Sequence, residues 1–162
     1  MASDDPLTHF SSAGAAHMVD IDAKPETPRQ ARATARVRMA AATYERIAAG
    51  QIGKGDVLGV ARLAAIGATK RCAELIPLCH PVRVTAVSVD FELLEDLPGV
   101  EVSADVRAVD RTGPEMEAMM AASVGALTIY DMCKAMDRGM VVEQTLLVEK
   151  RGGKSGHWRR DA

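Results

Sequence analysis

RTGPEMEAMMAASVGALTIYDMCK, residues 111–134, is the stretch that decides the fold. Thr112 is followed three residues later by Glu115, which is the spacing of a helix capping box, and Pro114 is tolerated in a first helical turn. We therefore expect a long helix that begins here and ends near Asp137. Its small residues permit another backbone to approach closely, for example that of a second subunit: Ala118, Ala121, Ala122, Ser123, Gly125 and Ala126.

Runs typical of β-strands lie on both sides of this helix. Residues 82–94 and 100–109 are rich in β-branched residues, and the turn sequence EDLPG, residues 95–99, separates them. This arrangement predicts a hairpin. Residues 141–149 follow the helix as a predicted closing strand.

The N-terminal half of the chain predicts two further strands and two further helices. Residues 18–23 and 31–39 alternate apolar and polar side chains, as half-buried strands do. A short helix is predicted over residues 42–51, and a longer one from an N-cap at Asp56 to about Leu75. The later order of helix, strand, strand, helix, strand predicts an α+β fold, a ferredoxin-like split β-α-β sandwich with helices covering a mainly antiparallel sheet, plus N-terminal strands.

Composition indicates a single domain with two irregular ends. The chain has 162 residues and 48% hydrophobic content, enough for one sizeable core, which we assign to residues 17–151. Residues 1–16 show no sustained periodicity and are expected to be flexible. Residues 152–162 are a Gly-rich basic tail, which either closes over an anionic ligand as a lid or only aids solubility.

The overall charge argues against a macromolecular partner other than the chain itself. The net charge is −2 and aromatic residues make up 3%, so we expect neither nucleic-acid nor membrane binding. Apolar runs are interrupted well before the roughly 18 residues that span a bilayer. Three cysteines without C-x-x-C spacing fit the reducing cytoplasm.

Charged residues within apolar sequence mark the candidate chemistry. The segment IPLCHP, residues 76–81, carries His80, and the predicted long helix carries Glu117, Asp131 and Lys134 on one broad face. The 14 positions from Glu117 to Asp131 span roughly 21 Å, too far for one reacting centre. Two antiparallel copies of the helix, related by a two-fold axis, would bring the two ends together. We therefore expect a site built from two subunits.

Each of these features also has a structural explanation. Acids in the first turn and Lys134 in the last turn are favoured by the helix dipole. His80 and Cys79 have no second histidine or cysteine at metal-ligand spacing, so we expect no metal site. GGKSG, residues 152–156, is not a phosphate-binding P-loop, because Val148 stands where that motif needs glycine. The arginines of the second strand are expected to form a solvated face: Arg32, Arg36 and Arg38.

Several motifs in order resemble those of the molybdenum-cofactor biosynthesis protein C family. They are LTH at residue 7, MVDI at 18, K-x-x-T-x-R at 24–29, KGD at 54, IPLCHP, RTG-x-EMEA, LTIYDMCKA and EK-x-GGKSG, and the resemblance covers residues 7–156. The chain departs from the usual family pattern at Ala65, Gly67, Pro114 and Met119–Met120. None of these changes removes a proton-transfer group, although Pro114 can shift the entry of the helix and so alter the rate.

This resemblance implies a lyase of molybdenum cofactor biosynthesis. It implies conversion of (8S)-3′,8-cyclo-7,8-dihydroguanosine 5′-triphosphate to cyclic pyranopterin monophosphate with release of pyrophosphate, in a hexamer arranged as a trimer of dimers. It places catalytic roles on Asp131, Lys134 and Lys54, and leaves His80 either to contact phosphate or to transfer a proton. Substrate contacts are implied at Leu78, Cys79, His80, Met116 and Glu117, with Glu115, Arg29 and Lys150 completing the pocket.

The chemistry of the residues is compatible with that reaction. Ring rearrangement needs timed proton transfers, which require a lysine with a lowered pKa held by an acid, such as Lys134 beside Asp131. The triphosphate needs cations, and Arg29, Lys54, Lys150 and Lys154 can supply them. No cofactor is required by the sequence, and Mg²⁺ can accompany the triphosphate. Two alternatives are a non-catalytic purine-triphosphate-binding or assembly module of the same fold, and a metal-dependent hydrolase that uses Cys79 and His80.

Overall fold

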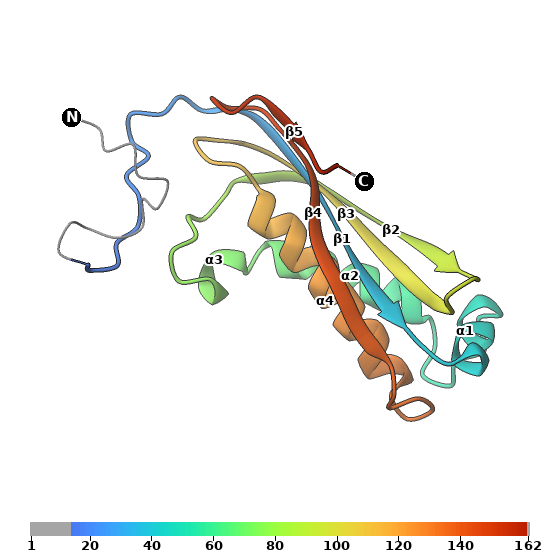
Figure 1. Ribbon diagram of the computed structural model, residues 1–162. Helices are drawn as coiled ribbons and strands as arrows, with labels where there is room; N and C mark the ends of the chain where they lie inside the picture. The colour runs from blue at the N-terminus through green and yellow to red at the C-terminus, as the bar shows by residue number, and fades with distance from the viewer. Residues whose placement is uncertain (1–13, 162) are drawn as a thin grey trace.

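The computed structural model describes residues 14–161, which form one antiparallel sheet covered by helices on one face (Figure 1). The elements in chain order are β1 (Thr27–Arg38), α1 (Ala41–Ala48), α2 (Val57–Thr69), α3 (Cys72–Leu75), β2 (Val84–Leu94), β3 (Gly99–Asp110), α4 (Glu115–Cys133), β4 (Val141–Arg151) and β5 (His157–Arg159). The described strands pair antiparallel in the order β2-β3-β1-β4-β5. This order confirms the predicted α+β, ferredoxin-like sandwich, and β5 extends its edge.

Alternating side chains on the central strands build the core. On β1, Ala31, Ala33, Ala35 and Val37 are buried, and α4 packs across β1 and β3 on that face. Most of the small residues of α4 are buried in this packing within the chain: Ala118, Ala121, Ala122, Gly125 and Ala126. A Cβ added at Gly125 would lie 3.0 Å from Val102 Cγ1, so the helix approaches the sheet as closely as a glycine allows.

The opposite face of the sheet is charged, as predicted. Its arginines pair with acids of the neighbouring strands: Arg36 Nε lies 2.6 Å from Glu101 Oε2, and longer ion pairs join Arg32 to Asp105 and Arg38 to Glu143. All three arginines remain well exposed. This face is therefore a solvated, ion-paired surface.

Two expected elements in the N-terminal half are wrong. Residues 18–23 form no strand, because the chain turns there: Asp22 N donates to Asp20 Oδ1 at 2.8 Å, and Lys24 N donates to Ile21 O at 3.0 Å. The predicted helix from Asp56 to Leu75 is two helices, since Lys70 and Arg71 donate to carbonyls only three residues back and close the last turn of α2. The N-cap at Asp56 is confirmed: its Oδ1 accepts from Gly59 N at 2.8 Å.

The long helix α4 differs from its prediction at both ends. No capping box forms, because Pro114 occupies the N-cap position and the Glu115 side chain pairs with Lys150 instead. The helix ends at Cys133, four residues before the predicted end at Asp137. The Asp137 carboxylate instead accepts a hydrogen bond from Ala40 N at 2.8 Å.

The two irregular ends are only partly covered by the structure. The predicted flexible segment 1–16 lies outside the described residues except for residues 14–16. In the tail, His157–Arg159 form β5 and pair with β4, a strand that the sequence analysis did not expect. Among residues 14–161, no helix is both long and apolar enough to cross a bilayer.

Candidate active site

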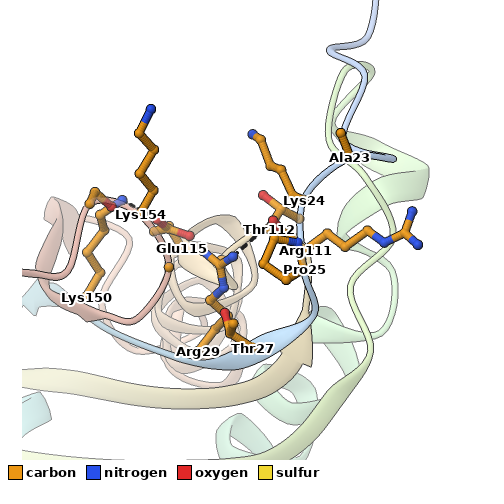
Figure 2. Close-up of a pocket in the computed structure, with 13 residues that line it drawn as sticks. Ala23, Lys24, Pro25, Thr27, Arg29, Arg111, Thr112, Glu115, Lys150 and Lys154 are labelled. Carbon is orange, nitrogen blue, oxygen red and sulfur yellow. Dashed lines mark hydrogen bonds and ion pairs between the residues drawn. The ribbon is translucent and has the colours of Figure 1, made fainter.

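Three segments meet beyond the N-terminal end of α4 and enclose a cavity of about 850 Å³. They are the chain before β1, the loop between β3 and α4, and the turn between β4 and β5 (Figure 2). Among the described residues of its lining, five are cations and one is an acid: Lys24, Arg29, Arg111, Lys150 and Lys154, and Glu115. An excess of cations in a concave site favours an anionic ligand.

Two of these cations are held by the fold. Lys150 Nζ lies 2.9 Å from Glu115 Oε1, and both side chains are half-buried. Arg29 donates to the carbonyl oxygens of Asp110 and Arg111 at 3.3 and 3.1 Å, respectively. Figure 2 shows Arg29 between Lys150 and Lys154 on one side and Lys24 and Arg111 on the other. The guanidinium is thus fixed toward the middle of the cationic wall.

The Gly-rich turn forms the third wall of this cavity. Gly152 and Gly153 have φ values of +99° and +70°, and a Cβ added at Gly153 would collide with the Arg29 guanidinium. Gly152 N donates to Gly156 O at 3.0 Å, which closes a hairpin turn between β4 and β5. The segment is therefore a turn between strands and not a P-loop, and it places Lys154 and Ser155 at the cavity.

A second cavity, of about 370 Å³, adjoins the first, and no lysine or arginine of residues 14–161 lines it. Leu78, Met116, Cys79 and His80 line it, and Thr112, Gly113 and Glu115 line both cavities. The structure therefore brings together the predicted contacts of the segment 76–81 and those of the start of α4. Glu115 therefore stands at the border between the cationic cavity and the second one.

Glu117 lies behind this second cavity and not in its lining. Its side chain is 2% exposed and lines a separate cavity with Cys72. Desolvation by burial raises the pKa of Glu117 above its usual value. The predicted direct contact of Glu117 with substrate is thus not visible in the chain alone.

Asp131, Lys134 and Lys54 form a separate cluster at the C-terminal end of α4. Lys134 Nζ lies 2.7 Å from Asp131 Oδ1, and Lys54 Nζ donates to the main-chain oxygen of Asp131 at 2.9 Å. The hydrogen bond and charge of Lys134 lower the pKa of Asp131, and Asp131 in turn raises the pKa of Lys134. In the chain alone this is opposite to the lowered lysine pKa that the sequence analysis expected.

Comparison with known proteins identifies the family. The profile of the MoaC family matches residues 18–153. The chain belongs to the MoaC family. A curated relative from Heliobacterium modesticaldum, named cyclic pyranopterin monophosphate synthase, is 56% identical over 157 residues, which are 97% of this chain and 99% of the relative. The family predicted from the sequence motifs is confirmed.

Some residues at the cavities of this MoaC chain were not singled out from sequence, among them Lys24, Arg111 and Cys72. Lys24 and Arg111 line the cationic cavity, and Cys72 lies beside Glu117. Lys24 and Arg111 do begin two of the motifs by which the family was recognised, so those motifs were the available signal. Cys72 had none, because its proximity to Cys79 depends on the break between α2 and α3.

Proposed function

We propose that this MoaC-family chain is a cyclic pyranopterin monophosphate synthase, a lyase of molybdenum cofactor biosynthesis. It converts (8S)-3′,8-cyclo-7,8-dihydroguanosine 5′-triphosphate to cyclic pyranopterin monophosphate and releases pyrophosphate. The observation that carries the proposal is the pair of adjoining cavities at the start of α4, one lined by five lysines and arginines and the other, within the described chain, by none. A purine-derived triphosphate likewise has two parts, an anionic triphosphate for the cationic cavity and a fused-ring part for the adjoining one.

The cationic cavity suits the triphosphate. Such a group carries about four negative charges, and Arg29 with the surrounding lysines can form charge-assisted hydrogen bonds to it. Positive charges around the departing pyrophosphate stabilise the charge that develops on its leaving oxygen. The protein itself supplies five cations at this cavity: Lys24, Arg29, Arg111, Lys150 and Lys154. Any Mg²⁺ would enter with the triphosphate as its counter-ion.

The adjoining cavity suits the fused rings. Leu78 and Met116 offer apolar contact, while Cys79, His80 and Glu115 offer polar groups to the ring edge. His80 lines the same cavity and would either contact phosphate or transfer a proton. A pocket with apolar walls and a few polar groups is the usual design for a small organic ligand.

Catalysis requires the cluster at the far end of α4 to reach the same pocket. We propose that two copies of the chain pack their α4 helices antiparallel about a two-fold axis, so that Asp131, Lys134 and Lys54 of one subunit meet the cavities of the other. The cationic wall of the second subunit would then lower the pKa of Lys134 and prepare it for proton transfer. Such dimers would assemble in threes as a hexamer.

The reaction is tested by supplying the cyclised triphosphate and measuring pyrophosphate and pterin product. Lys134→Ala and Asp131→Asn should lose at least about a hundredfold in rate, the scale of a general acid–base contribution. Wild-type chain without product, or both variants at full rate, would refute the assignment. Tight binding of the triphosphate without turnover by wild type would instead favour the non-catalytic binding module.

The shared pocket is tested by mixing Lys150→Met and Asp131→Asn chains at a substrate concentration well below the wild-type KM, where each variant alone keeps at most about a tenth of the wild-type rate. If a pocket takes Lys150 from one subunit and Asp131 from the other, each mixed dimer has one intact and one doubly defective pocket. Equal mixing then restores about a quarter of wild-type activity, because about half the dimers are mixed and each regains one of two pockets. Verified mixed dimers that gain no rate over the two variants alone would refute the arrangement.

A further inference from the structure

Two cysteines and a carboxylate converge behind the proposed ring pocket. Cys72 is the first residue of α3, Cys79 lies in the following loop, and Glu117 lies in the first turns of α4. One ligand atom from each residue, the two Sγ atoms and a carboxylate oxygen, all lie within 4.8 Å of one another. The sequence analysis found no second cysteine for Cys79, because the chain has to turn back after α2 to supply one.

One oxygen of the Glu117 carboxylate lacks the partner that its burial demands. Within the described part of the chain, Glu117 Oε2 is buried and has no hydrogen-bond partner, and the whole residue is 2% exposed. A buried, unpartnered carboxylate oxygen is costly, and native structures satisfy such groups with hydrogen bonds or bound ions. Cys72 is equally buried, at 1% exposed. The cluster therefore combines metal-ligand atoms with an unfilled bonding requirement.

We propose that Cys72, Cys79 and Glu117 bind one thiophilic divalent cation, for which Zn²⁺ has the matching chemistry. Two thiolates and a carboxylate are ligands that zinc accepts in tetrahedral sites, whereas Mg²⁺ and Ca²⁺ take oxygen ligands alone. Cys72 and Glu117 also line a cavity of about 270 Å³, together with Thr69 and Lys70. That cavity leaves room for a water ligand.

Burial of the cluster disfavours the charged form of each of the three groups. Desolvation by burial raises the pKa of Cys72 to about 12 and also raises the pKa of Cys79 and of Glu117. Cation binding must therefore displace the protons of the two thiols, so the apparent affinity rises with pH. A bound ion would tie α3 and the segment 76–81 to α4 and so hold Leu78 and His80 at the proposed pocket. The ion has a positioning role here.

The test uses the full chain, reduced with a phosphine, and cobalt as the spectroscopic probe. Co²⁺ should bind at one equivalent per chain with a thiolate-to-cobalt charge-transfer band, and Zn²⁺ should displace it. Cys72→Ser and Glu117→Gln should each weaken Co²⁺ binding at least tenfold. Cys133→Ser is the matched control, because Cys133 is also buried but lies in the core away from this cluster, and it should leave binding unchanged. Circular dichroism verifies that each variant folds.

A second measurement decides the question on the wild-type chain. Zn²⁺ should slow alkylation of Cys72 and Cys79, read by peptide mass spectrometry, and leave the rate at Cys133 unchanged. Absence of the charge-transfer band, a band that Cys72→Ser does not weaken, or equal alkylation with and without Zn²⁺ would overturn the proposal. Because no substrate is present, these results are independent of whether the chain is a synthase.

Discussion

Lys150, which pairs with Glu115, can be compared with Arg151, its neighbour in sequence, to test the cationic cavity. Lys150 lies at the cationic cavity, whereas Arg151, the next residue of β4, is exposed and pairs with Glu149. Lys150→Met removes a charge-assisted contact to phosphate and should raise KM about tenfold with a smaller change in kcat. Steady-state kinetics of the lyase reaction measure both. Arg151→Met makes the same charge change outside this cavity, so a comparable rise in its KM would contradict the assignment.

Asp110 links the stability of the fold to pH. Burial alone would raise the pKa of its carboxyl, but hydrogen bonds from the backbone N–H groups of Arg83 and Arg111 outweigh it and lower the pKa below the usual value. A carboxylate with a lowered pKa stabilises the fold above its unfolded pKa of about 3.9, and this contribution is lost as pH falls through the folded value.

Asp110→Asn should therefore flatten the acid limb of stability against pH. Urea unfolding at a series of pH values below about 5 measures the limb, because both the unfolded and the lowered folded pKa lie in or below that range. Asp90→Asn, at an exposed position of β2, is the control. An acid limb that is equally steep in wild type and Asp110→Asn would show that the two backbone hydrogen bonds do not set the titration.

At the scale of elements, the sequence predicted the strands and turns that depend on contacts between neighbours along the chain. The alternation of β1 and the turn between β2 and β3 depend on neighbours in sequence, and both were found. The failures occur where distant contacts decide. The carboxylate of Glu115 pairs with Lys150 of β4 instead of closing a capping box, and Asp137 bonds to Ala40 beside α1 instead of extending α4. No pattern within either segment carries that information.

The N-cap of α2 is an element-scale prediction that the structure allows to be tested. Asp56 accepts a hydrogen bond from Gly59 N, one of the N–H groups that the helix itself leaves unpaired. Asp56→Ala should cost about 1 kcal/mol of unfolding free energy, measured by urea denaturation. Asp56→Asn keeps a side-chain acceptor and should cost much less. Equal losses in the two variants would mean that the cap contributes nothing.

At the scale of the whole molecule, the sequence predicted many of the residues of the candidate site but little of their arrangement in space. The separation of Glu117 from Asp131 follows from helix dimensions, and the structure keeps the two clusters at opposite ends of α4. The convergence of Lys24, Arg29 and Lys154 could not be inferred in the same way. It depends on how the sheet edge, the segment before β1 and the β4–β5 turn meet in three dimensions.

The outer face of the helical layer is where a second subunit would complete the site. Leu63 of α2 is 73% exposed and Leu127 of α4 is 55% exposed, and each lies opposite the buried stripe of its helix. The helices α2 and α4 pack side by side, so these side chains belong to one layer. We expect these two exposed apolar side chains to lie in the proposed contact between subunits. A two-fold contact along α4 there would run the helices antiparallel, as the shared pocket requires.

Placing charges on this face should therefore dissociate the assembly and stop the reaction together. Leu63→Glu with Leu127→Glu is expected to shift the mass seen by light scattering toward the single chain, while circular dichroism stays unchanged because neither side chain is in the core. Leu97→Glu is the control, since Leu97 is 66% exposed but lies in the turn between β2 and β3. Synthase activity should fall with the mass, because Asp131 of one subunit would no longer reach the cations of the other. A fully active single chain would show that each subunit holds a complete site.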